Sequence, residues 1–245
     1  MGTSYNPRIV TDGLVLCLDA ANKRSYPGAG NKWTDLTANK NNGTLTNGPT
    51  FDSANAGSIV FDGTNDSVTL GPTNDIVGNS PAAISLSAWF KTSSTNAMYI
   101  ASLKRFSTNS TLVSITINQA GDGAYGSSNA ANHLGFLYDT SGSNHKWVTV
   151  NNSTFYGKWT QITATVDANA CTLYLNGVRA GQNTDAAFVG SSRTDPSADF
   201  TIGAFAASHG SLFANANISQ VHVYNRVLSA SEVQQNYLAT RGRFQ

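Results

Sequence analysis

The feature that most constrains this chain is a succession of short runs of β-branched and aromatic residues, separated by clusters of Gly, Asn, Asp and Ser. Such runs suit pleated strands and the clusters suit turns, so the pattern is typical of an all-β sandwich or barrel. The abundant Asn, Ser and Thr residues are weak helix formers, which disfavours long helices and coiled coils. The runs predicted as strands are 13–20, 58–61, 67–70, 84–91, 98–103, 112–117, 134–138, 147–150, 159–166, 172–175, 200–202 and 218–224.

Two local patterns support the prediction of strands. In 84–91 apolar and polar residues alternate, which places Ile84, Leu86, Ala88 and Phe90 on one face of a strand. Asn176-Gly177 separates 172–175 from Val178, and this pair favours a tight hairpin turn in which both residues have positive φ.

One helix is predicted, near the end of the chain. Ser229-Ala230-Ser231-Glu232 is a capping box, in which the serine hydroxyl and the glutamate carboxylate each bond a free backbone N–H. Val233, Tyr237 and Leu238 follow at helical spacing and predict a stripe that faces the sheet. Residues 229–241 are therefore interpreted as a docking helix without a chemical role.

The chain is predicted to form a single domain, 1–245, with an N-terminal arm over 1–12. All-β sandwiches often reach roughly this length as one unit, and no linker interrupts the composition. Cys17 and Cys171 lie in apolar runs. We interpret them as two buried thiols, with a single disulfide as the alternative, because their spacing matches no metal or redox motif.

Charge and hydropathy exclude several partners. Fifteen Lys+Arg against fourteen Asp+Glu give a net charge of +1, so the chain has no long-range attraction for nucleic acid or an anionic membrane. No apolar run approaches the ~20 residues of a membrane span. The segment 1–5 lacks the layout of a signal peptide, so we expect synthesis in the cytoplasm without one.

The acidic residues argue against catalysis. Glycoside hydrolysis normally needs two carboxylates across the scissile bond, and Glu232 is the one glutamate of the chain. A lyase needs a Tyr or His base beside a basic residue, and the four histidines are scattered. No Gly-x-Ser-x-Gly motif supports a serine nucleophile. The sequence therefore predicts a protein without enzymatic activity.

Several segments in order resemble a known superfamily. They are Gly13–Asn22, Trp33–Leu36, Asn42–Pro49, Phe61–Gly63, Ser87–Phe90, Leu173–Gly177 and Val223–Ser229. Together they resemble the laminin-G-like branch of the concanavalin A-like lectin/glucanase superfamily, found in phage and bacterial surface proteins. The resemblance implies a two-sheet antiparallel jelly roll with about six or seven strands in each sheet, and function in loops along one rim.

Laminin-G-like domains often bind calcium at the rim, so calcium is the cofactor that the resemblance suggests. Asp62, Asn65 and Asp66 lie on one tight turn, and Asp139 lies on another candidate rim loop. Oxygen ligands of this kind suit a hard cation. The alternative is a turn whose Asp and Asn side chains bond their own backbone.

Carbohydrate binding needs aromatic rings beside polar groups on an exposed surface. The candidates near the long loops are Tyr125, His133, His145 and Trp147. Trp89 and Trp159 lie within strand patterns, so we expect them to pack in the core.

Fold alone does not decide function, because jelly rolls include lectins, hydrolases, lyases and virion parts. We interpret the chain as a structural protein of a phage virion, a capsid decoration or fibre subunit. It would dock on capsid or tail proteins at the particle surface and bind host-surface polysaccharide weakly, with a homo-oligomer as another expected partner. The alternatives are a free, extracellular lectin-like domain of a bacterial surface system and, third, a polysaccharide hydrolase or lyase.

Overall fold

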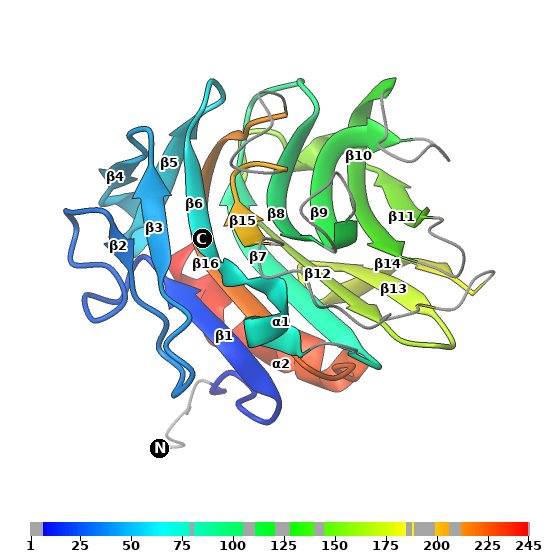
Figure 1. Cartoon of the computed structure of the whole chain (residues 1–245). Coiled ribbons are helices and arrows are strands. Elements are labelled where there is room, and N and C mark those ends of the chain that lie inside the picture. Colours follow the sequence, from blue (N-terminus) through cyan, green and yellow to red (C-terminus); the bar gives the residue numbers. More distant parts are fainter. Residues whose placement is uncertain are drawn as a thin grey trace, which may run out of the picture.

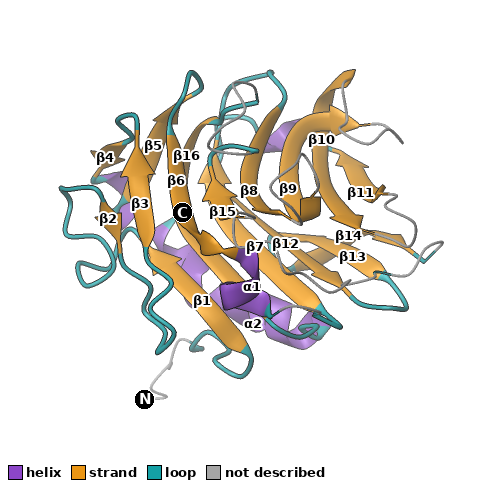
Figure 2. Cartoon of the chain, in the orientation of Figure 1, coloured by secondary structure: helices purple, strands orange, loops and turns teal. Residues whose placement is uncertain are grey.

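The protein is a sandwich of two antiparallel β-sheets (Figures 1 and 2). The computed structural model describes residues 7–78, 81–104, 111–120, 128–139, 145–184, 188, 199–205 and 212–244. In this part of the chain each sheet has eight strands. The expected jelly-roll architecture is confirmed. The strands missing from the sequence-based prediction lie at or next to an edge of their sheet, and two of them have only two or three residues.

Sheet A carries the C-terminal helix. Its strands, in order across the sheet, are β14 (Val178–Asn183), β13 (Cys171–Leu175), β12 (Thr160–Val166), β7 (Ile84–Lys91), β16 (Asn215–Tyr224), β5 (Ser58–Asp62) and β4 (Thr50–Asp52), and β1 (Leu14–Asp19) also pairs with β16.

Sheet B forms the other layer. Its strands, in order, are β11 (His145–Asn151), β10 (Ser128–Asp139), β9 (Thr111–Ala120), β8 (Met98–Lys104), β15 (Asp199–Ile202), β6 (Ser67–Pro72), β3 (Gly43–Thr46) and β2 (Lys32–Trp33). The turn between β5 and β6 therefore crosses from one sheet to the other, and the two strands do not form a hairpin.

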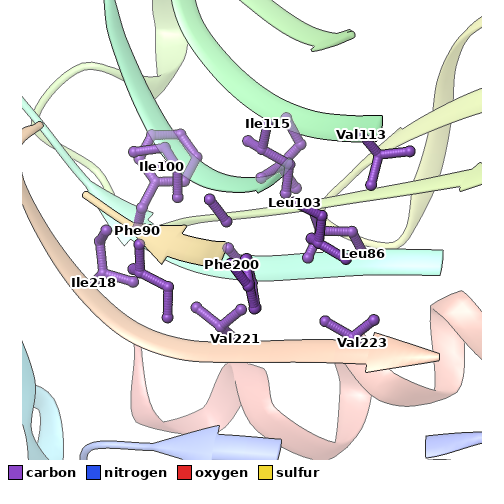
Figure 3. Close-up of a cluster of buried hydrophobic side chains, with 14 of the residues drawn as sticks. Leu86, Phe90, Ile100, Leu103, Val113, Ile115, Phe200, Ile218, Val221 and Val223 are labelled. Carbon is purple, nitrogen blue, oxygen red and sulfur yellow. The ribbon is translucent and has the colours of Figure 1, made fainter. Parts of the chain in front are cut away.

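The core lies between the sheets, where their inner faces meet (Figure 3). Ile84, Leu86, Ala88 and Phe90 all belong to it, as the alternation in this strand predicts. In Figure 3, Ile100, Ile115 and Val113 face Phe90, Leu86 and Val221 from the opposite layer.

Both cysteines are buried free thiols, as expected. Cys171 belongs to the core between the sheets. Burial raises the pKa of Cys17 to about 12 and raises that of Cys171 as well, so both side chains behave as small uncharged groups.

The C-terminal helix α2 (Ala230–Thr240) begins at the predicted capping box and packs on the outer face of sheet A. Figure 3 shows this helix on the side of β16 away from the core. The buried residues of α2 are Val233, Asn236 and Thr240, whereas Leu238 is exposed. The predicted stripe is therefore wrong at Leu238.

The reason lies in the polar character of the sheet surface beneath α2. Ser85 Oγ donates to the carbonyl of Arg226 (2.7 Å), and Trp89 Nε1 donates to Thr240 Oγ1 (2.9 Å). Because this surface offers hydrogen-bonding groups, polar residues of α2 face it.

The described part of the chain also has short helices of a single turn: α1 (Thr73–Val77), and the 3₁₀ turns η1 (Ala54–Ala56) and η3 (Ser153–Phe155). A fourth turn, η4 (Arg241–Arg243), extends α2 toward the end of the chain. Among the described helices, none combines the length and apolar character that a membrane span requires.

The Asn176-Gly177 turn is confirmed. Asn176 has φ 50° and Gly177 has φ 79°, and the turn joins β13 to β14. A Cβ atom at Gly177 would lie 2.9 Å from Cβ of Tyr237, so glycine also permits the close approach of α2.

The described part of the N-terminal arm is bound to α2. Val10 N donates to Asn236 Oδ1 (2.7 Å), and Gln235 Nε2 donates to the carbonyl of Arg8 (2.7 Å). The arm is also bound to β16, because Tyr224 Oη donates to the carbonyl of Val10 (3.0 Å).

Candidate functional site

The residues predicted to bind glycan do not form one exposed platform. Tyr125 lies outside the described residues, as does the side chain of His145 at the start of β11. His133 is half-buried on β10 and pairs with Asn151, whereas Trp147 pairs with Leu137. Four pair positions, roughly 13 Å along the strand, therefore separate His133 from Trp147.

Trp147 is not an exposed ring. Its side chain is 8% exposed, and a Cβ atom at Gly135 would lie 3.6 Å from its Cε3 atom. Trp147 therefore offers no open stacking face in this structure, because its ring is buried beside Gly135, which leaves room for it.

The Asp62–Asp66 turn uses its own polar groups. Asp62 Oδ1 accepts from the backbone N–H of Thr64 (2.7 Å), and Asp66 Oδ2 accepts from that of Asp62 (3.0 Å). The backbone carbonyl of Asn65 accepts from Asn47 (2.9 Å). Burial raises the pKa of Asp66.

Asp139 lies too far from that turn to complete a calcium site. β6, β8 and β10 run in one direction, because one antiparallel strand separates each from the next. Asp66 precedes β6 and Asp139 ends β10, so the backbones of the two residues lie at opposite ends of the strands of sheet B. Within the described residues, no three His, Cys, Asp or Glu side chains gather to hold a metal ion. In the described residues the Asp62–Asp66 turn matches the alternative, a turn whose side chains bond their own backbone.

A different surface combines aromatic and basic side chains. On the outer face of sheet A, beside the end of α2, a groove of about 400 Å³ opens to solvent. We call it the aromatic–basic groove. It is lined by Asn55, Trp89, Lys91, Gly157, Lys158, Trp159, Asn176, Tyr237, Arg241 and Phe244.

The aromatic wall of the groove is held rigidly. The Phe244 ring lies between two tryptophans, with centroid distances of 4.2 Å to Trp89 and 4.8 Å to Trp159. Tyr237 also stacks on Trp89, with a centroid distance of 5.8 Å. Trp89 is buried beneath these rings, whereas Trp159 is half-buried and borders the open space.

Asn55 fixes the position of Trp159 and of the C-terminal tail. Its Oδ1 accepts from Trp159 Nε1 (3.0 Å), and its Nδ2 donates to the carbonyl of Arg243 (3.1 Å). Arg243 also pairs with Asp19 at 2.9 Å. The tail that supplies Phe244 is thus tied to the first strand and to the loop after β4.

The polar groups of the groove include amides. Asn176 Oδ1 accepts from the backbone N–H of Gln161 (2.9 Å), and its Nδ2 has no partner in the described part of the chain. This amide and the Trp159 ring lie on the same groove wall.

A second hollow of about 220 Å³ adjoins the groove. Lys158, Trp159 and Asn176 line both spaces, so Trp159 stands where they meet. The second hollow adds the side chains of Asn152 and Thr154.

Trp89 is buried, but it packs beneath α2 on the outer face of sheet A and not in the core between the sheets. Trp159 is half-buried and is not a core residue either. Trp159 precedes β12, at the strand end where alternation no longer fixes which face a side chain takes. The Asn176-Gly177 turn, the end of β7 and the C-terminal Arg-Gly-Arg-Phe were visible in the sequence, but nothing local shows that they meet.

The one glutamate of the chain is bonded away from the groove. Glu232 pairs with Arg226 (2.7 Å) and caps α2, and these hydrogen bonds lower the pKa of Glu232 to about 2. Among the described residues that line the aromatic–basic groove there is no carboxylate.

Comparison with protein families gives a match over most of the chain. The model of the concanavalin A-like lectin/glucanases superfamily matches residues 62–234. Comparison with curated proteins gives no match.

Solved structures share the fold at low sequence identity. The botulinum neurotoxin serotype G binding domain is similar with a TM-score of 0.66 and 17% identity, over 91% of this chain and 50% of that one. A serotype D ligand binding domain in complex with N-acetylneuraminic acid gives 0.64 and 14%, over 92% and 50%. Trypanosoma rangeli sialidase in complex with the inhibitor DANA gives 0.67 and 14%, over 96% and 35%. The chain thus spans half or less of each.

Proposed function

Because the chain belongs to the concanavalin A-like lectin/glucanases superfamily, we propose that it is a non-enzymatic carbohydrate-binding domain with the aromatic–basic groove as its glycan site. The observation that carries the proposal is Trp159, a half-buried ring fixed by Asn55 and Phe244 at the border of an open groove. Sugars present apolar faces that stack on aromatic rings and hydroxyls that bond nearby polar groups.

The charges around the groove support binding without catalysis. Hydrolysis of a glycosidic bond would need two carboxylates in reach of one sugar, and the described groove lining has none. Glu232 is committed to Arg226 and to the start of α2.

The test is the Trp159→Ala variant, measured against the glycans that a glycan array identifies for the wild type. Removing a stacking ring is expected to weaken binding about tenfold, with folding preserved in the circular dichroism spectrum. Leu238→Ala is the matched control, because Leu238 is exposed on α2 outside the groove. Unchanged affinity in Trp159→Ala would contradict the proposed site, and release of reducing ends from a bound polysaccharide would contradict the absence of catalysis.

We propose the surface of a phage particle as the place where the domain acts, with the domain docked on capsid or tail proteins. The low content of charged residues, 12%, supports contacts through neutral hydrogen bonds that ionic strength does not weaken. Val178 on β14 and Leu238 on α2 are large hydrophobic side chains exposed to solvent, and we propose them as points of contact with a neighbouring protein.

Mass spectrometry of purified particles tests this location. The expected result is a fixed copy number that matches the symmetry of the capsid or tail. A chain found free in the lysate, and missing from washed particles, would favour the free lectin-like domain instead.

A further inference from the structure

We propose that the aromatic–basic groove selects polysaccharides that carry carboxylate groups, and that it holds at least two successive sugar residues. This inference rests on the proposed function and specifies its ligand class. The charge preference follows from three cationic side chains in the groove and from the nearby carboxylates, which are already hydrogen-bonded to other residues. The length of the ligand follows from the second hollow beyond Trp159.

The cations of the groove are available to a ligand. Lys91, Lys158 and Arg241 line the groove, and none of them forms an ion pair in the described part of the chain. Arg226 and Arg243, by contrast, are both paired with carboxylates.

Arg241 is also held in place. Its guanidinium lies over the Tyr237 ring, 5.8 Å from the centroid. A guanidinium stacked in this way keeps its N–H groups free for a carboxylate, which it binds through two parallel hydrogen bonds.

The carboxylates on adjoining elements are already bonded. Asp19 accepts from Arg243 and from Gln220 (2.9 Å to each), and Asp52 accepts from Asn217 (3.3 Å). A neutral sugar would leave the three cations of the groove without a counter-charge, whereas a carboxylated sugar would supply one.

The two hollows set the length of the ligand. Trp159, Lys158 and Asn176 line both, so a sugar stacked on Trp159 would have neighbours on either side. One side offers the aromatic wall with Lys91 and Arg241. The other offers the polar side chains of Asn152 and Thr154, which suits the hydroxyls of the next residue in a chain.

The first experiment compares ligands that differ only in charge. Isothermal titration calorimetry is carried out with oligogalacturonate, hyaluronan and alginate oligosaccharides, and with each after methyl esterification of its carboxylates. At least one acidic oligosaccharide is expected to bind, about tenfold more tightly than its ester, and to weaken as salt is raised. A disaccharide is expected to bind more tightly than the monosaccharide.

The second experiment removes the cations one at a time. Lys91→Gln, Lys158→Gln and Arg241→Gln are each expected to lower affinity for the acidic ligand about threefold and to leave the affinity for its ester unchanged. Lys32→Gln is the matched control, because it removes the same charge from an exposed site on β2 of the other sheet.

The outcomes separate the two proposals. If the wild type bound the acidic oligosaccharide and its ester equally, and Trp159→Ala bound neither, the charge selection would be overturned and the glycan site would stand. No binding of any glycan would overturn both. Lys32→Gln could also lower the affinity for the acidic ligand as much as the groove variants do. The wild type could bind a single-stranded oligonucleotide as tightly as the acidic oligosaccharide. Either result would mean unspecific attraction of polyanions and would overturn the inference.

Discussion

At the scale of single residues, the outer face of sheet A is organised by polar side chains beneath α2 and the C-terminal tail. Ser87 Oγ and Thr163 Oγ1 share a hydrogen bond (2.8 Å), and Trp89 Nε1 is bonded to Thr240. His222 lies in the same layer, where it is buried, and its Nε2 atom has no hydrogen-bond partner among the described residues. A buried imidazole that must take up a proton makes the fold sensitive to acid.

The pH dependence of stability follows from the position of His222. Burial lowers its pKa to about 4 from an ordinary 6.5; Asp19 raises the pKa and Arg243 lowers it, each less than burial does. Between these values the unfolded chain binds a proton that the native protein does not, so stability falls as pH falls from 6.5 toward 4. The free energy of unfolding is expected to drop by about 2 kcal/mol between pH 7.5 and 5.0.

Urea titrations at the two pH values measure this drop. His222→Gln is expected to remove most of it, and His133→Gln, a half-buried histidine on β10, should behave as the wild type. A His222→Gln variant with the same loss of stability as the wild type would show that other groups cause it.

At the scale of elements, the features that the sequence predicts are those encoded within a few residues. The Asn176-Gly177 turn, the capping box of α2 and the alternation along β7 are all present, because each depends on local dihedral angles or local hydrogen bonds. β2 and β4, with two and three residues, are too short to carry a pattern. The exposure of Leu238 was not predictable either, since it depends on the polar surface against which α2 packs.

At the scale of the whole molecule, the candidate site is assembled from segments that are distant in the sequence. Asn55, Lys91, Trp159, Asn176 and Phe244 come from five separate stretches of the chain. The fold was predictable because its motifs recur in order along the chain. The groove was not, because its walls meet only after β7, β12, β13 and the C-terminal tail have packed together.

The four tryptophans provide the most direct measurement of the central claim, that glycan binds at the aromatic–basic groove. In ¹⁵N-labelled protein, each indole N–H gives its own NMR signal, assigned with Trp→Phe variants. On addition of the oligosaccharide that binds most tightly, we expect the Trp159 signal to shift while those of the buried Trp33 and Trp147 stay in place. A shift at Trp147 with Trp159 unchanged would put the ligand on sheet B and contradict the proposed site.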